Sequence, residues 1–118
     1  MDENGADAAP QGSRYVDQRP YVVADSLDEL DGPVTGTVLL DSRLDWSGHA
    51  QYDLDNHRRL ASLYETVLRE ASSQDDLTRW LNATLLVELW AGLVLPPHLR
   101  RAWETRFPAL ASARSRAA

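Results

Sequence analysis

The densest concentration of large apolar side chains lies in residues 74–110, and this stretch limits which folds are open to the sequence. Three of the four tryptophans lie in it: Trp80, Trp90 and Trp103. An almost uninterrupted apolar run extends from Leu85 to Pro97, where two consecutive prolines signal the start of a new helix. Tryptophans at helical apolar positions usually belong to a core, so the sequence predicts helices packed together around this stretch.

Residues 56–71 show the clearest helical periodicity in the sequence. Their apolar side chains recur with helical spacing at Leu60, Leu63, Tyr64, Val67, Leu68 and Ala71. Asp55 precedes this run directly, where an N-cap is expected. A capping box formed by Ser73 and Asp76 predicts the start of the next helix. At Asn82 that helix either continues or restarts with Asn82 as its cap.

The two ends of the chain are expected to lie outside the folded part. Residues 1–19 are acidic and nearly lack the large apolar groups that would offset the entropy of ordering them, so they predict a disordered tail. Pro97 predicts the beginning of the last helix, and Pro108 predicts its end or a kink. We therefore expect one globular domain over residues 20–110, followed by a frayed C-terminal tail at residues 111–118.

Short β-prone runs precede the helices. Tyr21–Val23 and Val34–Leu40 are rich in β-branched and aromatic residues, which predicts two strands. Between them, Ser26 and Glu29 form a capping box that predicts a single helical turn. Gly32 follows this turn and is expected to end it by adopting a positive φ angle.

A third strand is predicted where Tyr52 and Leu54 alternate with two aspartates. The fold class that follows is α+β, with a small two- or three-stranded antiparallel sheet from residues ~20–54 packed on about four C-terminal helices. A two-stranded unit is marginal on its own, so the helices are expected to supply the surface on which it packs.

Charge is unevenly divided along the chain. Residues 1–55 hold twelve acidic residues and three arginines, a net charge of −9, whereas residues 56–118 hold nine arginines and six acidic residues, a net charge of +3. The acidic half suits a basic partner, because complementary charge speeds encounter. There is no signal peptide pattern and no apolar run of the roughly 18 residues that a membrane span needs, so a cytoplasmic protein without membrane contact is expected.

No motif in the sequence fixes a biochemical activity. The absence of cysteine excludes disulfides and cysteine-ligated zinc. His49, Asp53, Asp55 and His57 have side chains that can bind a metal, but their spacing matches no familiar binding pattern. Ser47 lies near a histidine and an aspartate, yet catalytic triads are assembled by tertiary geometry and seldom by sequence neighbours. No phosphate-binding glycine motif occurs, so we predict no catalytic residue, no metal and no cofactor.

These features favour non-catalytic recognition of a protein partner. Trp46 lies in a loop, and an exposed loop tryptophan is a typical binding anchor. We expect it to act with four aspartates of the acidic half, namely Asp28, Asp31, Asp41 and Asp45. Buried apolar anchors would supply most of the affinity, and the acidic residues would attract a basic surface.

A helical DNA-binding accessory or transcriptional regulator is the alternative interpretation. Residues 84–91 and 97–107 have the outline of a helix-turn-helix, and the second helix carries His98, Arg100 and Arg101, which could face phosphates. The connection between the two helices is longer than usual, however, and the net charge of −6 has the wrong sign for a stand-alone DNA binder. An ordinary pair of packed helices explains the same pattern.

Over residues 20–110 the chain resembles a small family of actinobacterial proteins encoded directly before nucleotidyltransferase-type toxins of the AbiE kind. The resemblance rests on three runs: LDWSGHAQYDLDNHRRLASLYETVLREA, LTRWLN and LPPHLRRAWETRFPAL. It implies an antitoxin-like or companion role in which the acidic half faces a basic surface on the toxin. It assigns no role to any individual residue.

Overall fold

The structure, a computed structural model, describes residues 21–117 and confirms the predicted α+β fold class. In chain order its elements are η1 (Leu27–Glu29), β2 (Thr37–Leu39), β3 (Gln51–Asp53), α2 (His57–Glu70), α3 (Gln74–Trp80), α4 (Ala83–Leu89), η2 (Trp90–Gly92), α5 (Pro97–Arg106) and α6 (Pro108–Ala117). The expected disordered tail at residues 1–19 lies outside the described residues.

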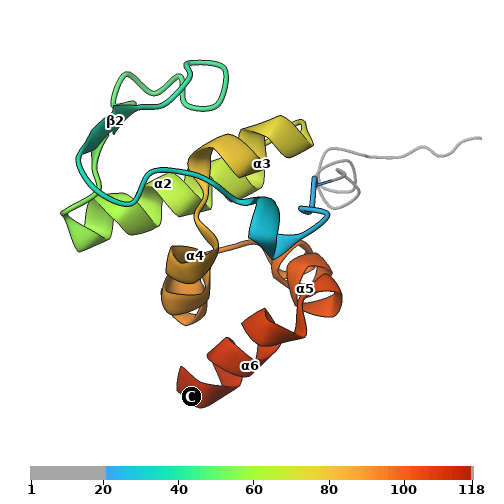
Figure 1. The fold of residues 1–118 in the computed structure, drawn as a ribbon. Coiled ribbons are helices and arrows are strands. Elements are labelled where there is room, and N and C mark those ends of the chain that lie inside the picture. Colours follow the sequence, from blue (N-terminus) through green and yellow to red (C-terminus); the bar gives the residue numbers. More distant parts are fainter. Residues whose placement is uncertain (1–20, 118) are drawn as a thin grey trace, which may run out of the picture.

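The elements form two groups, which Figure 1 shows one above the other. In the upper group the hairpin and the loop that joins its strands lie over α2, which packs against β3 and α3. In the lower group α6 packs against α4, η2 and α5. The hairpin loop and the C-terminal helix therefore lie at opposite ends of the molecule.

The sheet is the two-stranded antiparallel pair of β2 and β3, in the register Thr37↔Asp53, Val38↔Tyr52 and Leu39↔Gln51. The strands predicted around Val38 and Tyr52 are thus confirmed, although both are short. The strand predicted at Tyr21–Val23 was wrong, because a side chain takes the place of a neighbouring strand there. The Gln74 amide donates to the carbonyl oxygen of Val23 (2.8 Å) and accepts from the main-chain N–H of Asp25 (3.0 Å).

Short polar side chains begin the helices, mostly where the sequence predicts. Ser26, Ser73 and Asn82 cap η1, α3 and α4, each by accepting a main-chain N–H of the first turn. The first long helix differs from the prediction by one residue. Its N-cap is Asn56, whose side-chain oxygen accepts from Arg59 N (3.2 Å). Asp55 still belongs to the turn after β3, in which Asp53 accepts from Asp55 N (2.9 Å) and from Asn56 N (3.1 Å).

The C-terminal tail was also predicted incorrectly, because residues 108–117 form a helix. The predicted end of α5 at Pro108 is confirmed, since α5 stops at Arg106 and Phe107 is extended. Pro108 is also the first residue of α6, where the missing N–H of proline costs nothing. Leu110 and Ala113 bury this helix against the rest of the molecule. Arg114 adds a bidentate ion pair to Glu104, with N–O distances of 2.6 and 2.8 Å, and so fixes α6 to α5.

The core occupies the region that the tryptophan-rich stretch predicts. Trp90 and Trp103 are fully buried, with their ring centroids 6.4 Å apart, and Phe107 lies 5.7 Å from Trp103. The indole N–H of Trp90 donates to Glu104 (2.8 Å), which joins η2 to α5. The indole nitrogen of Trp103 is buried without a hydrogen-bond partner among the described residues.

Gly32 is required for close packing and not for a positive φ angle, which corrects the reason that the sequence suggests. Only Gly36 and Gly48 adopt positive φ among the described glycines. At Gly32 the chain touches the end of α3, where Gly32 N donates to the carbonyl oxygen of Leu81 (2.8 Å). A Cβ atom on Gly32 would lie 2.4 Å from the carbonyl carbon of Trp80, which is closer than such atoms can approach.

We therefore predict that Gly32→Ala lowers the free energy of unfolding by about 2 to 3 kcal/mol, since neither main-chain segment can move without losing hydrogen bonds. Urea denaturation at neutral pH measures this loss. The matched control is Gly92→Ala, because a Cβ atom there meets nothing within 4 Å. The control is expected to change stability by less than about 1 kcal/mol, and an equal loss in both variants would contradict this account of Gly32.

Candidate functional site

Two large apolar side chains are exposed in the hairpin region and line the same hollow. Trp46 is 83% exposed in the loop between β2 and β3, and Leu39 is 72% exposed on β2. Both line an open hollow of about 1020 Å³, together with Thr37, Ser42, Asp45, Gly48, His49, Ala50, Gln51, Asp53 and Arg59. Exposed apolar groups of this size that share one hollow are characteristic of binding surfaces.

The hairpin has one face toward the core and one toward this hollow. Because side chains alternate along a strand, Val38 and Tyr52 point inward toward the core, and β3 packs on α2. Thr37, Leu39, Gln51 and Asp53 point outward and are all exposed. The hollow therefore lies over the outer face of the sheet and is bordered by the loop that carries Trp46.

The start of this loop is fixed by a buried carboxylate. Asp76 in α3 is only 5% exposed and accepts from the Arg43 guanidinium through both of its oxygens, at 2.6 and 3.2 Å. The same carboxylate accepts from the main-chain N–H of Ser72 (2.9 Å). These interactions lower the pKa of Asp76 to about 2, and the hydrogen bond from the Arg43 guanidinium has the largest effect. Leu40 before it and Leu44 after it are buried in the core, so the loop is held on both sides of Arg43.

A second bond holds the loop immediately before Trp46. The Tyr52 hydroxyl donates to the Asp45 carboxylate at 2.5 Å, and this hydrogen bond is the main cause that lowers the pKa of Asp45. Asp45 also accepts from the main-chain N–H of Ser47 (3.0 Å). Burial raises the pKa of Tyr52, so the phenol stays a donor over the range in which the carboxylate is ionised.

Arg59 supports the far end of the loop from the first turn of α2. Its guanidinium donates to the carbonyl oxygens of His49 (2.9 Å) and Gln51 (2.7 Å). The guanidinium also lies over the ring of Tyr52, 4.1 Å from its centroid. Such cation–π contacts are worth about 0.5–1 kcal/mol even when partly exposed. Trp46 is therefore carried by a loop that is tied to the body of the protein at several points.

A second, smaller hollow of about 190 Å³ also borders Trp46. It is formed by the loop and the C-terminal half of α2, through Leu44, Asp45, Trp46, Ser47, Thr66, Arg69 and Glu70. Trp46 thus borders both hollows, so a partner in contact with its indole can also reach the surface of α2.

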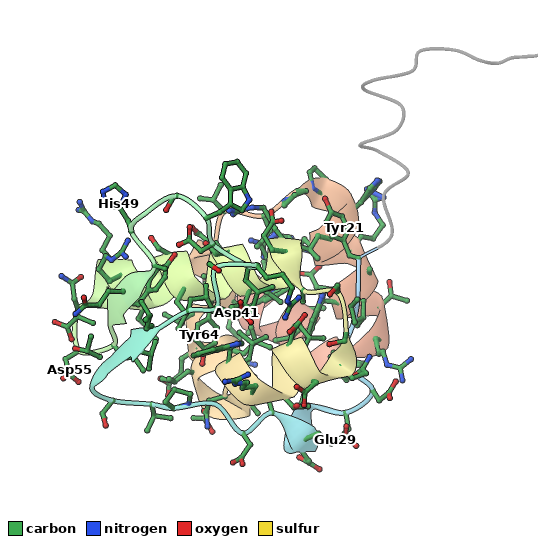
Figure 2. All side chains as sticks on the ribbon, turned by 90° about the horizontal axis from the view of Figure 1, so that it is seen from above. Tyr21, Glu29, Asp41, His49, Asp55 and Tyr64 are labelled. Atoms are coloured by element: carbon green, nitrogen blue, oxygen red, sulfur yellow. The ribbon has the colours of Figure 1, made fainter. Side chains whose placement is uncertain are left out.

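The structure brings together only part of the predicted partner-binding set. Trp46 and Asp45 line the main hollow, and Asp41 is exposed at the start of the same loop. Asp45 is not available as a docking charge, because its carboxylate binds Tyr52. Asp28 and Asp31 lie in and after η1, well away from the hairpin. Figure 2 shows this separation, with Glu29 of η1 and His49 of the loop at opposite edges of the molecule.

Sequence reasoning did not identify Leu39 and Arg59 as members of the site. A signal for Leu39 was present, because Leu39 and Leu40 are consecutive in a strand and must point to opposite faces. Leu40 is buried, so Leu39 is exposed. The role of Arg59 depends on how α2 crosses the hairpin, and no local pattern carries that information.

The predicted nucleic-acid residues lie on α5, away from this site. Arg100 is used inside the protein: its guanidinium donates to the carbonyl oxygens of Trp90 (3.2 Å) and Leu93 and lies over the Trp90 ring. Arg101 and His98 line a shallow hollow of about 430 Å³ beside Tyr21. Of the three residues, Arg101 is the exposed cation on this surface.

Comparisons with known proteins find no matching family model, no matching curated protein and no matching solved structure. Within residues 21–117, none of the helices is both long and apolar enough to cross a membrane. In the same part of the chain, no three histidine or acidic side chains come together in a way that could hold a metal ion.

The link between Asp76 and Arg43 predicts a specific dependence of stability on pH. A carboxyl group whose folded pKa is lowered from 3.8 to about 2 stabilises the fold above pH 4, and this stabilisation is lost as the pH falls toward 2. The shift corresponds to about 2 kcal/mol. Asp76→Asn should therefore lower the free energy of unfolding by about 2 kcal/mol at pH 7, and its difference from wild type should shrink between pH 4 and pH 2.

Urea denaturation at several pH values, followed by circular dichroism, measures this difference. Asp75→Asn is the matched control, because Asp75 precedes Asp76 in the same helical turn but is exposed. We expect the control to change stability by less than about 1 kcal/mol. An Asp76→Asn deficit that is constant from pH 7 to pH 2 would contradict the assigned role of the carboxylate.

Proposed function

We propose that this protein is a non-catalytic interaction module that binds a protein partner through the outer face of the β2–β3 hairpin and the loop carrying Trp46. The observation that carries the proposal is the large exposure of Trp46 on a loop that is tied down around it. An exposed indole on a loosely held loop would lose much of its binding energy in ordering that loop. Here the loop is already ordered, so the binding energy is retained.

Charge supports a basic partner. Residues 21–55, which include the hairpin, hold eight acidic residues and one arginine, a net charge of −7. Asp41 and Asp53 are exposed at the loop and on the outer face of the sheet. A basic surface would be attracted to this region over several ångströms, and Trp46 and Leu39 would then supply the buried contact.

The sequence resemblance predicts an antitoxin-like role for this module. In that case the partner would be a nucleotidyltransferase-type toxin with a basic surface. The DNA-binding alternative has less support, because Arg100 has its partners within the protein. It would depend on Arg101 and His98, at a distance from the exposed tryptophan.

A capture experiment in the native host tests the proposed function. We predict that Trp46→Ala reduces the affinity for the captured partner about 30-fold or more, as expected for an anchor residue. The thermal midpoint should change by less than about 2 °C, because the indole is 83% exposed and makes little contact with the core. Affinity is measured by titration with the purified partner, and stability by differential scanning calorimetry.

The matched control for this variant is Val94→Ala. Val94 is 77% exposed, but it lies in the segment between η2 and α5, outside the hairpin surface. We expect this substitution to leave affinity unchanged. Loss of binding in the Val94 variant with full binding in the Trp46 variant would place the interaction elsewhere. A large fall in the thermal midpoint of the Trp46 variant would show that Trp46 belongs to the core.

A further inference from the structure

We propose that the hairpin binds its partner by strand addition: an extended, basic segment of the partner protein pairs with the free edge of β2 and lies against Leu39 and Trp46. This inference rests on the proposed function and adds the form and chemistry of the bound segment. Its basis is an asymmetry between the two edges of the hairpin, because one edge is covered by a side chain and the other is open.

The hydrogen bonds at the two ends of the hairpin fix the pattern of the ladder. Leu40 N donates to the carbonyl oxygen of Ala50 (2.9 Å), and Leu54 N donates to the carbonyl oxygen of Gly36 (2.8 Å). Both pairs therefore belong to the hydrogen-bonded class of an antiparallel ladder. Such pairs alternate along the strands with pairs whose main-chain groups point away from each other.

In this alternation Val38 directs its main-chain groups to β3, and Thr37 and Leu39 direct theirs outward. The outer edge of β2 thus presents two N–H and two C=O groups in the spacing of a strand. Within residues 21–117 the sheet has two strands, so no further strand covers this edge. Open strand edges of this kind are templates for pairing with another chain.

The edge of β3 is different, because Arg59 covers it. The outward-facing carbonyl oxygens of His49 and Gln51 accept from the same guanidinium nitrogen at 2.9 and 2.7 Å. A partner strand on this side would have to displace that guanidinium from two carbonyl groups and from the ring of Tyr52. Strand addition is therefore directed to β2.

The exposed apolar side chains lie where an added strand would need them. Leu39 projects from the outer face of the sheet, and Trp46 lies across the same hollow. Alternate side chains of a strand beside β2 would point over this outer face and could contact both residues. Main-chain hydrogen bonds would then fix the direction of the segment, and the two apolar contacts would select its sequence.

Charge decides between a foreign segment and a second copy of this chain. Pairing of β2 with the β2 of a second copy would bring together two regions that each carry a net charge of −7 over residues 21–55. Like charges across a strand pair are destabilising. A segment with arginine or lysine beside its apolar positions instead complements Asp41 and Asp53, so we assign the edge to a basic peptide segment.

The probe for the test is a displayed library of random peptides of about 10 residues, the upper length of an ordinary strand. The library is selected on the full-length protein, and the peptide most enriched is synthesised. Its affinity is measured by isothermal titration calorimetry for wild type and for variants. We expect the selected sequences to alternate apolar residues with arginine or lysine, and we expect Trp46→Ala to weaken their binding.

The decisive comparison is between Leu39→Pro and Leu39→Ala. Both variants lose the leucine side chain, but only proline also removes the outward N–H, which the hairpin does not use. We expect the proline variant to bind about tenfold more weakly than the alanine variant, the effect of one lost main-chain hydrogen bond. The matched control is the same pair of changes, Gln51→Pro and Gln51→Ala, because Gln51 faces Leu39 in the register and its N–H lies on the covered edge. These two variants should bind with equal affinity.

A second measurement, amide hydrogen exchange, uses wild-type protein and so does not require the proline variants to fold. In wild-type protein, amide hydrogen exchange at Thr37 and Leu39 should slow at least tenfold when peptide is bound, because these N–H groups become donors.

Equal affinities of the proline and alanine variants, with unprotected amides, would overturn strand addition while leaving the Trp46 surface intact. Peptides whose binding ignores Trp46→Ala would count against the proposed function itself. A dimer of the free protein that Leu39→Pro dissociates would assign the edge to a second copy.

Discussion

The carboxylate of Asp76 is the interaction on which the position of the candidate site depends most. It lies in the first turn of α3, is nearly inaccessible to water, and binds both the main chain at Ser72 and the guanidinium of Arg43. A buried carboxylate without partners would be strongly unfavourable. Because Arg43 is the partner that comes from a distant part of the chain, satisfying this carboxylate also fixes the loop that carries Trp46.

The same principle recurs around the hairpin: charged side chains are used to hold main chain in place. Asp45 holds the loop through Tyr52, and Arg59 binds two carbonyl oxygens at the edge of β3. A hairpin of two three-residue strands would be marginal alone. The side chains that stabilise it here also determine its binding properties, since they cover one strand edge and leave the other open.

The helical part of the fold could be predicted closely from sequence, because caps and periodicity are local signals. Ser73, Asn82 and Pro97 each mark a helix start that the structure confirms. The wrong predictions have a common cause: contacts with groups that are distant in the sequence override the local conformational preference of a segment. Tyr21–Val23 is β-prone but bonds to Gln74, and the tail after Pro108 is helical because Arg114 and Leu110 have partners on other elements.

The candidate site could be predicted only in part for the same reason. Trp46 could be singled out as a loop tryptophan, and its exposure agrees with that expectation. The grouping of acidic residues could not be obtained, because Asp28 and Asp31 share composition with Asp41 but lie on a different part of the surface. Leu39 and Arg59 acquire their roles from strand register and helix crossing, which are tertiary properties.

The central claim is that the binding surface is the outer side of the hairpin and its loop. Its most direct test is a map of chemical-shift changes in the ¹⁵N-labelled protein on addition of the purified partner. We expect the largest changes at the amides of residues 37–51 and at the indole N–H of Trp46. Changes concentrated instead on residues 97–106, with the hairpin signals unaffected, would contradict it.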